Sequence, residues 1–174
     1  MAADLKTRLI QVFDAVDADG DKKLTVDELQ EAFAKLGFPP LERKTWGHFF
    51  TVYDNDHDDR INLEEFRKIH EDFTKWRAVF DGIRSQEGVV SIEQAVAALK
   101  LSDAIVSKLG RFGEAGLIKY DAFIEICLMN RAITMEWEAM ATVDGQPDRR
   151  SVTLESLAVA FTKVYKIERD STAD

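Results

Sequence analysis

The chain has 174 residues, of which 45% are hydrophobic and 10% aromatic, with only three prolines and a formal net charge of −9. This length suits one substantial domain or two small lobes, and this composition suits a folded, mostly helical protein. The acidic balance argues against nucleic acid as a partner, because a phosphate backbone needs Lys and Arg side chains opposite it.

Residues 17–28, "DADGDKKLTVDE", place carboxylates at the first, third, fifth and twelfth positions and an apolar residue at the eighth. Four anionic side chains so close together repel one another unless a cation lies between them. A calcium loop uses these same positions, together with the carbonyl oxygen of position 7 and, through water, the side chain of position 9. The predicted ligands are Asp17, Asp19, Asp21, the carbonyl of Lys23, Thr25 through water, and Glu28.

Residues 54–65, "DNDHDDRINLEE", repeat the same spacing. For a single copy of this motif, a solvated acidic turn without a bound ion is the alternative interpretation. The second copy makes this alternative much weaker. Neither loop has a cysteine, and His57 falls at a non-ligand position, so the hard oxygen ligands favour calcium over a transition metal. We expect two calcium ions per chain, with Mg²⁺ as an alternative occupant of the loops at rest. The predicted ligands are Asp54, Asp56, Asp58, the carbonyl of Arg60, Asn62 and Glu65.

The sixth position of such a loop makes a sharp turn that favours glycine. Lys22 occupies it in the first loop and Asp59 in the second. Because Asp tolerates a left-handed backbone better than Lys does, we expect the first loop to be the more strained of the two.

Apolar residues recur at helical spacing on both sides of each loop, from residue 9 to 16 and 29 to 36, and from 46 to 53 and 66 to 73. Gly37 and the Pro39–Pro40 pair end the second of these helices. A loop between two amphipathic helices is the EF-hand motif. The predicted fold class is therefore all-α, an EF-hand array with short β-bridges between paired loops.

The apolar eighth position forms a β-bridge with a sister hand, so it marks further repeats. The marks are Leu24, Ile61, Val90, Ile118 and Val152, which indicates five hands. Counted back from these marks, the last three have no carboxylate at positions 1 and 12, and they should not bind calcium. We read the third as a lengthened loop that begins at Asp81. Ordinary helical turns remain the alternative for these three hands.

Two long segments without Gly or Pro, residues 66–80 and 120–141, join adjacent hands as shared helices. We expect one EF-hand domain over residues 1–174. Within it, calcium-binding hands one and two span 1–73, degenerate hands three and four span 66–142, and the degenerate fifth hand with the C-terminal tail spans 121–174.

These features resemble the penta-EF-hand family, the family of sorcin, grancalcin and the calpain small subunit. The closest similarities are "FRKIHEDFTKWRAVFD", which leaves hand two, and "IKYDAFIEICLMNRAITMEWEAM", which joins hands four and five. The resemblance implies a calcium-responsive, dimeric adaptor or regulatory subunit that exposes apolar surface when loaded. One departure is the third hand, which usually binds calcium in the family and here lacks the ligands.

The favoured function is a calcium sensor that reorients its helices and exposes an apolar face to protein partners. The alternative is a cytosolic calcium buffer that resembles sarcoplasmic calcium-binding proteins. No catalytic pattern is present, so we do not expect an enzyme. Cys127 is the only cysteine, which favours a reducing compartment and hence the cytoplasm. No run of membrane-spanning length occurs, so membrane association is not indicated.

Hands stabilise each other in pairs, one with two and three with four, which leaves the fifth unpaired. An unpaired strand edge beside exposed apolar side chains is covered when a second copy of the chain meets it across a twofold axis. We therefore expect a homodimer. The predicted interface consists of Val152, Leu154, Leu157 and Phe161.

Overall fold

The computed structural model describes residues 2–101, 116–139, 142–143 and 146–147. The chain divides into two units, residues 1–74 and 75–174, which are taken separately below. The predicted dimer interface, from Val152 to Phe161, lies outside the described residues, as do residues 140 and 141 at the end of the second predicted long helix. None of the described helices combines the length and the apolar character that a membrane span needs.

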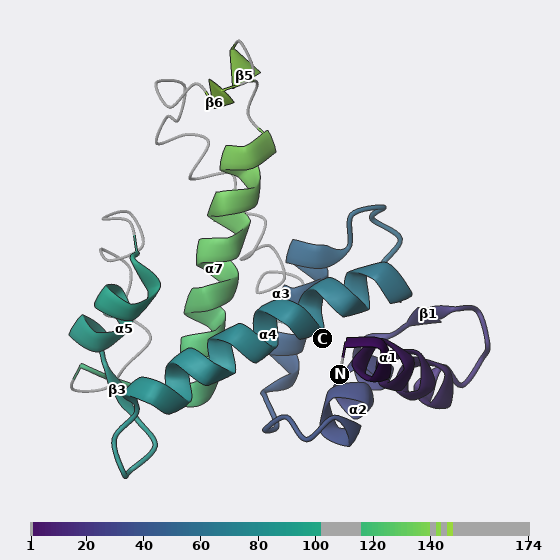
Figure 1. The fold of residues 1–174 in the computed structure, drawn as a ribbon, viewed down its shortest axis with the longest axis horizontal. Helices are drawn as coiled ribbons and strands as arrows, with labels where there is room; N and C mark the ends of the chain where they lie inside the picture. Colours follow the sequence, from purple (N-terminus) through teal and green to yellow (C-terminus); the bar gives the residue numbers. More distant parts are fainter. Residues whose placement is uncertain (1, 102–115, 140–141, 144–145, 148–174) are drawn as a thin grey trace, which may run out of the picture. The chain divides into compact units, whose positions relative to one another are not determined.

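The first unit follows the predicted order of helices and loops (Figure 1). Helix α1 (Ala2–Val16) leads into the first acidic loop, strand β1 (Lys23–Leu24) and helix α2 (Val26–Lys35). Helix α3 (Arg43–Tyr53) then leads into the second loop, strand β2 (Ile61–Asn62) and helix α4 (Leu63–Ile83). The result is two helix–loop–helix motifs, as the sequence predicts.

The two loops of the first unit are joined by a short antiparallel strand pair. Leu24 of β1 lies opposite Ile61 of β2, and both side chains are completely buried. These are the two apolar eighth positions, so the predicted β-bridge and its register are confirmed. Because strands that pair in this way run in opposite directions, the two loops lie side by side with their sequences antiparallel.

Helix α2 begins and ends at residues with clear capping roles. Thr25 accepts a hydrogen bond from the backbone of Glu28, whose carboxylate accepts one in return from the backbone of Thr25. At the other end Gly37 has a φ of 82°, a left-handed conformation that glycine adopts without strain. The predicted end of this helix at Gly37 is therefore confirmed to within two residues.

Phe33 lies at the centre of the apolar core of the first unit. Its ring centroid lies 5.4 Å from that of Trp46, 5.4 Å from that of Phe66 and 5.2 Å from that of Phe73. Phe38, which follows the end of α2, adds a further ring at 5.1 Å. Aromatic residues of α2, α3 and α4 thus pack around one side chain, which holds the helices of both hands together.

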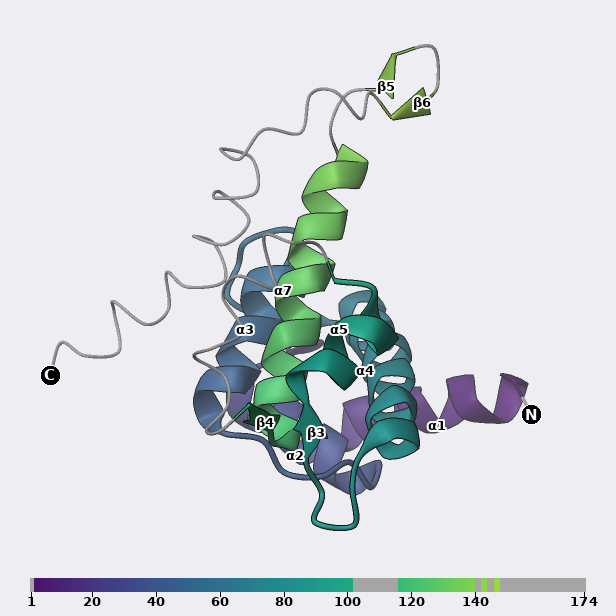
Figure 2. The same ribbon diagram turned by 90° about the vertical axis from the view of Figure 1, so that its left-hand side faces the viewer.

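The second unit also contains a short antiparallel strand pair. Strand β3 (Val90–Ser91) pairs with β4 (Leu117–Ile118) so that Val90 faces Ile118, which confirms both predicted register marks. Figure 2 shows these strands side by side where α5 (Ile92–Leu99) and α7 (Tyr120–Ala139) begin. The rings of Tyr120 and Phe123 lie 5.0 and 5.1 Å from that of Phe80. Strands β5 (Thr142–Val143) and β6 (Gln146–Pro147) form a separate hairpin.

Both predicted long helices are present as far as the structure describes them. Helix α4 is continuous over 21 residues and α7 over 20. Residues 123–129 of α7 are buried on all sides of the helix, and burial raises the pKa of the Cys127 thiol. Cys127 is therefore a structural residue, as its apolar surroundings in the sequence indicate.

Replacing Phe33 with Ala should lower the free energy of unfolding of the first unit by about 3–5 kcal/mol, because a buried ring is removed from the centre of the core. Urea unfolding followed by tryptophan fluorescence and circular dichroism measures the effect. Leu5→Ala is the control, because Leu5 is 45% exposed and its truncation should change the stability by only about 0.5 kcal/mol. Equal effects of the two substitutions would show that Phe33 is not central to the core.

Candidate metal centres

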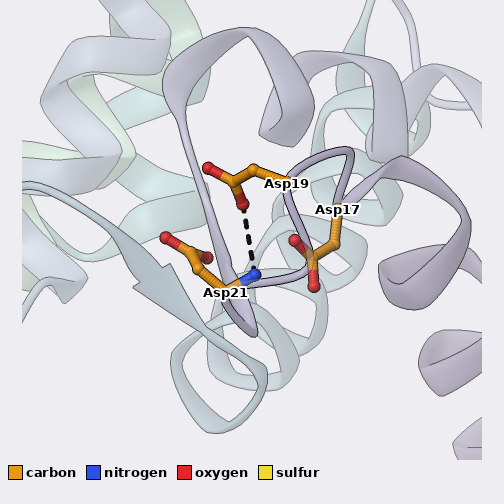
Figure 3. A group of neighbouring side chains, drawn as sticks. All are labelled: Asp17, Asp19 and Asp21. Atoms are coloured by element: carbon orange, nitrogen blue, oxygen red, sulfur yellow. Dashed lines mark hydrogen bonds between the residues drawn. The ribbon is translucent and has the colours of Figure 1, made fainter.

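The first acidic loop brings three carboxylates together between α1 and β1. Asp17, Asp19 and Asp21 each present an oxygen within 4.8 Å of the others (Figure 3). The Asp17 side chain is only 1% exposed, and it accepts hydrogen bonds from the backbone N–H groups of Gly20 at 2.9 Å and Lys22 at 3.1 Å. The Asp21 backbone donates to Asp19 at 3.2 Å, which is the dashed line in Figure 3. The loop is thus wrapped around the carboxylate of its first position.

Glu28 closes this loop from the first turn of α2. One of its oxygens accepts a hydrogen bond from the backbone of Ala18 at 3.0 Å, and the other accepts from the backbone and the hydroxyl of Thr25, each at 2.8 Å. Burial disfavours the charged carboxylate, but these donors outweigh it and lower the pKa of Glu28. The closing residue is therefore held ionised, with both oxygens directed at the loop.

The second loop has the same arrangement and is more deeply buried. Asp54, Asp56 and Asp58 present oxygens within 4.8 Å of one another. Asp54 is 7% exposed and Glu65 is 3% exposed. Glu65 accepts hydrogen bonds from the backbone of Asn55 at 2.9 Å and of Asn62 at 3.0 Å. The closing glutamate thus again joins both ends of its loop.

Burial raises the pKa of Asp54, and its hydrogen bond with the Asp56 carboxyl acts in the same direction. Burying carboxylates beside one another is unfavourable unless a cation compensates the charge. Hard oxygen donors in this number and grouping are the ligands that calcium prefers. The residues present therefore fit a calcium ion in each loop.

The structure gives Thr25 and Asn62, the two ninth positions, a second role. The Thr25 hydroxyl and the Asn62 amide oxygen accept hydrogen bonds from the backbone of Glu28 at 3.3 Å and of Glu65 at 3.1 Å. Both side chains therefore cap the helix that follows the loop. Their part as ligands stays a prediction, as do the carbonyl ligands Lys23 and Arg60.

Position 6 is left-handed in both loops, as expected, with φ of 67° at Lys22 and 58° at Asp59. Position 4 is left-handed too, at Gly20 in the first loop and at His57 in the second, where φ is 57°. Sequence reasoning missed this second turn, although the glycine at position 4 of the first loop was a signal for it. The expectation that the first loop is the more strained was therefore incomplete, because the second loop holds two non-glycine residues in this conformation.

The third hand is closed by a neutral side chain. Gln94 occupies the twelfth position, accepts a hydrogen bond from the backbone of Ser91 at 2.9 Å and donates one to the carbonyl of Ile83 at 3.3 Å. The expectation that this loop begins at Asp81 is wrong, because α4 continues to Ile83 and Asp81 pairs with Arg77 on the helix and with Arg84 directly after it. Within the described part of the chain, only the first two loops bring together three or more acidic side chains in a group that could hold a metal ion.

Two basic side chains at these loops make ion contacts that were not predicted from the sequence. Lys23 forms ion pairs with Asp56, at 3.3 Å, and with Asp58, both in the second loop. Hydrogen bonding to Asp58 raises the pKa of Lys23. Arg60 in turn approaches Asp19 and Asp21 of the first loop. Spacing along the chain could not reveal these contacts, because they depend on the pairing of β1 with β2.

Comparisons with known proteins agree with this geometry. The family model of the EF-hand domain pair matches residues 6–69. Mitochondrial substrate carrier family protein C of Dictyostelium discoideum is 33% identical over 96 residues, which are 52% of this chain and 19% of that protein. Mouse sorcin is 26% identical over 131 residues, which are 69% of this chain and 66% of sorcin. The chain spans about a fifth of the length of the mitochondrial carriers that it matches.

A solved structure shares the fold over most of the chain. The homolog of programmed cell death 6 protein from Leishmania major Friedlin matches with a TM-score of 0.57 at 22% identity. The match covers 90% of this chain and 93% of that one. The predicted EF-hand fold, mostly helical with short paired strands between the loops, is therefore confirmed.

Glu28→Gln and Glu65→Gln should each remove about one calcium site, because the amide cannot supply two anionic oxygens to the ion. Calorimetric titration with calcium should give two ions for the wild-type chain and one for each variant. Gln94→Ala is a control outside the acidic loops and should leave two. Three or more strong sites in the wild type would contradict the assignment of the later hands.

Lys22→Gly should tighten the first site several-fold, since a left-handed non-glycine residue costs roughly 1–2 kcal/mol and about 1.4 kcal/mol is tenfold in affinity. His57→Gly should tighten the second site, and Asp59→Gly should do so less than Lys22→Gly tightens the first. The readout is the calcium dissociation constant of each variant. Unchanged affinities in all three would show that backbone strain does not limit binding.

Proposed function

We propose that this chain is an EF-hand protein of the penta-EF-hand type and acts as a calcium sensor and adaptor. It binds two calcium ions through its first two hands and responds by exposing an apolar surface to a protein partner. Its role is binding rather than catalysis. The observation that carries the proposal is the pair of adjacent loops whose carboxylates converge, with Asp54 and Glu65 buried where a cation would neutralise them.

The contacts of Glu65 favour a sensor over a buffer. Glu65 is the closing ligand of the second loop, and it lies in the first turn of α4, directly before the buried Phe66. Phe66 and Phe73 of the same helix both contact Phe33 of α2. A shift of Glu65 toward a bound ion would therefore move a helix that packs against the centre of the core.

Helix α4 also links the loop to the rest of the chain. It begins at Leu63 beside the second loop and continues to Ile83, so it belongs in part to each unit. A continuous helix moves as one body, and a rotation at its start is transmitted to its end. This gives the calcium loops a route to the second unit, which a simple buffer does not need.

The proposal includes a protein partner bound on the exposed apolar surface and a homodimer formed through the fifth hand. It includes a cytoplasmic location, because the single cysteine, Cys127, favours a reducing compartment. A nucleic-acid partner does not fit the net charge of −9.

An apolar fluorescent dye, added during a calcium titration, tests the proposal. The dye signal should rise as calcium binds to the wild-type chain and stay flat in the Glu28→Gln, Glu65→Gln double variant. Calcium binding without a rise in dye signal would support the buffer, and no calcium binding would overturn both. Light scattering on the same samples should give the mass of a dimer.

A further inference from the structure

Lys23, in the first loop, forms ion pairs with carboxylates of the second loop. Its ammonium lies 3.3 Å from Asp56 and also bonds to Asp58, residues 33 and 35 positions further along the chain. These are the third and fifth positions of the second loop. The Lys23 side chain is 33% exposed, so solvent screens this contact only in part.

Arg60 makes the mirror-image contact. Its Nη1 atom lies 3.9 Å from a carboxylate oxygen of Asp19 and 4.0 Å from one of Asp21, the third and fifth positions of the first loop. This nitrogen is shielded from solvent and has no hydrogen-bond partner in the described structure. The interaction of Arg60 with the first loop is therefore electrostatic, and solvent screens it in part because the Asp19 and Asp21 side chains are 55% and 40% exposed.

The two contacts occupy equivalent places in the two hands. Lys23 and Arg60 both stand at position 7, and each reaches positions 3 and 5 of the neighbouring loop. The antiparallel pairing of β1 with β2, in which Lys23 lies opposite Asn62, brings each position 7 beside the other loop. An accidental surface ion pair would not be repeated at symmetry-equivalent positions.

We propose that Lys23 and Arg60 are crossed counter-ions, through which each loop lowers the calcium affinity of its neighbour. This inference rests on the proposed binding of calcium at both loops. A calcium ion in the second loop needs the oxygens of Asp56 and Asp58 that Lys23 engages, and its charge repels the ammonium. The ion and the side chain therefore compete for the same carboxylates, and the same holds for Arg60 in the first loop.

Lys22, the neighbour of Lys23, contacts carboxylates of its own hand and not of the neighbouring loop. Its ammonium lies 3.2 Å from Asp14 and 3.9 Å from Asp17, on its own side of the pair. The crossed arrangement is therefore a property of position 7. It predicts an effect on the neighbouring loop, whereas a general effect of positive charge would change the calcium affinity of both loops. A substitution in one loop should change calcium binding in the other.

Single-site backgrounds separate the two loops. Glu28→Gln leaves the second site to be measured alone, and Glu65→Gln leaves the first. Lys23→Met keeps the length of the side chain and removes its charge. It should tighten the second site roughly three- to tenfold. The first site should change much less, because the ligand expected from Lys23 is its backbone carbonyl, which the substitution keeps. Arg60→Met should show the reverse pattern, with a smaller tightening because its contacts are longer. Calorimetric titration with calcium chloride gives each dissociation constant.

Lys35→Met is the matched control, because it removes the same charge from a lysine that pairs with Glu31 on α2. It should change both sites equally and by less than about twofold. Raising the salt concentration should shrink the effect of Lys23→Met, since the competing contact is electrostatic. Tightening of both sites alike by Lys23→Met, or of neither, would overturn the crossed pair while leaving the proposed calcium sensor intact. A wild-type chain that binds no calcium would overturn the sensor and, with it, this inference.

Discussion

The pairing of Leu24 with Ile61 is the constraint on which the rest of the first unit depends. Both side chains are completely buried, and their antiparallel register fixes how the two loops face each other. That register brings Lys23 beside the carboxylates of the second loop and Arg60 beside those of the first. It also places the starts of α2 and α4 so that Phe33 and Phe66 meet in the core. Both hands therefore depend on the same strand pair.

The register, the flanking helices and the long shared helices could be predicted from the sequence, because each depends on local spacing. Val90 and Ile118 were found by the same apolar mark as Leu24, although their loops lack acidic ligands. What the sequence could not provide are the features that depend on tertiary geometry. The reach of Lys23 to Asp58, for example, requires the loops to be side by side. The left-handed backbone at His57 was missed for another reason, because the glycine at the same position of the first loop, Gly20, was not used as a signal. The start of the third loop was misplaced because Asp81, which was expected to begin the loop, lies in α4 and pairs with Arg77 and Arg84.

The acidic loops combine two opposing electrostatic effects. Asp54 and Glu65 are buried, which makes their charge unfavourable without a cation and so favours a bound ion. The basic side chains at position 7 act in the opposite direction, because they satisfy part of the same charge from within the chain. In the sensor that we propose, the calcium affinity is the difference between these effects. Side chains that ligate no ion can therefore set the concentration at which the loops respond.

The third hand shows that closing an EF-hand loop does not in itself require an ion. Gln94 joins the two ends of that loop through its amide, accepting from Ser91 and donating to the carbonyl of Ile83. A neutral side chain that supplies its own donor needs no cation to neutralise it, whereas Glu65 in the second loop is a buried anion with acceptors only. The loop before α5 is thus closed by hydrogen bonds of the chain itself. Helix α4 starts at the second acidic loop and ends at the loop that Gln94 closes, so in the sensor that we propose a change at the second loop begins in the helix that leads to the third hand.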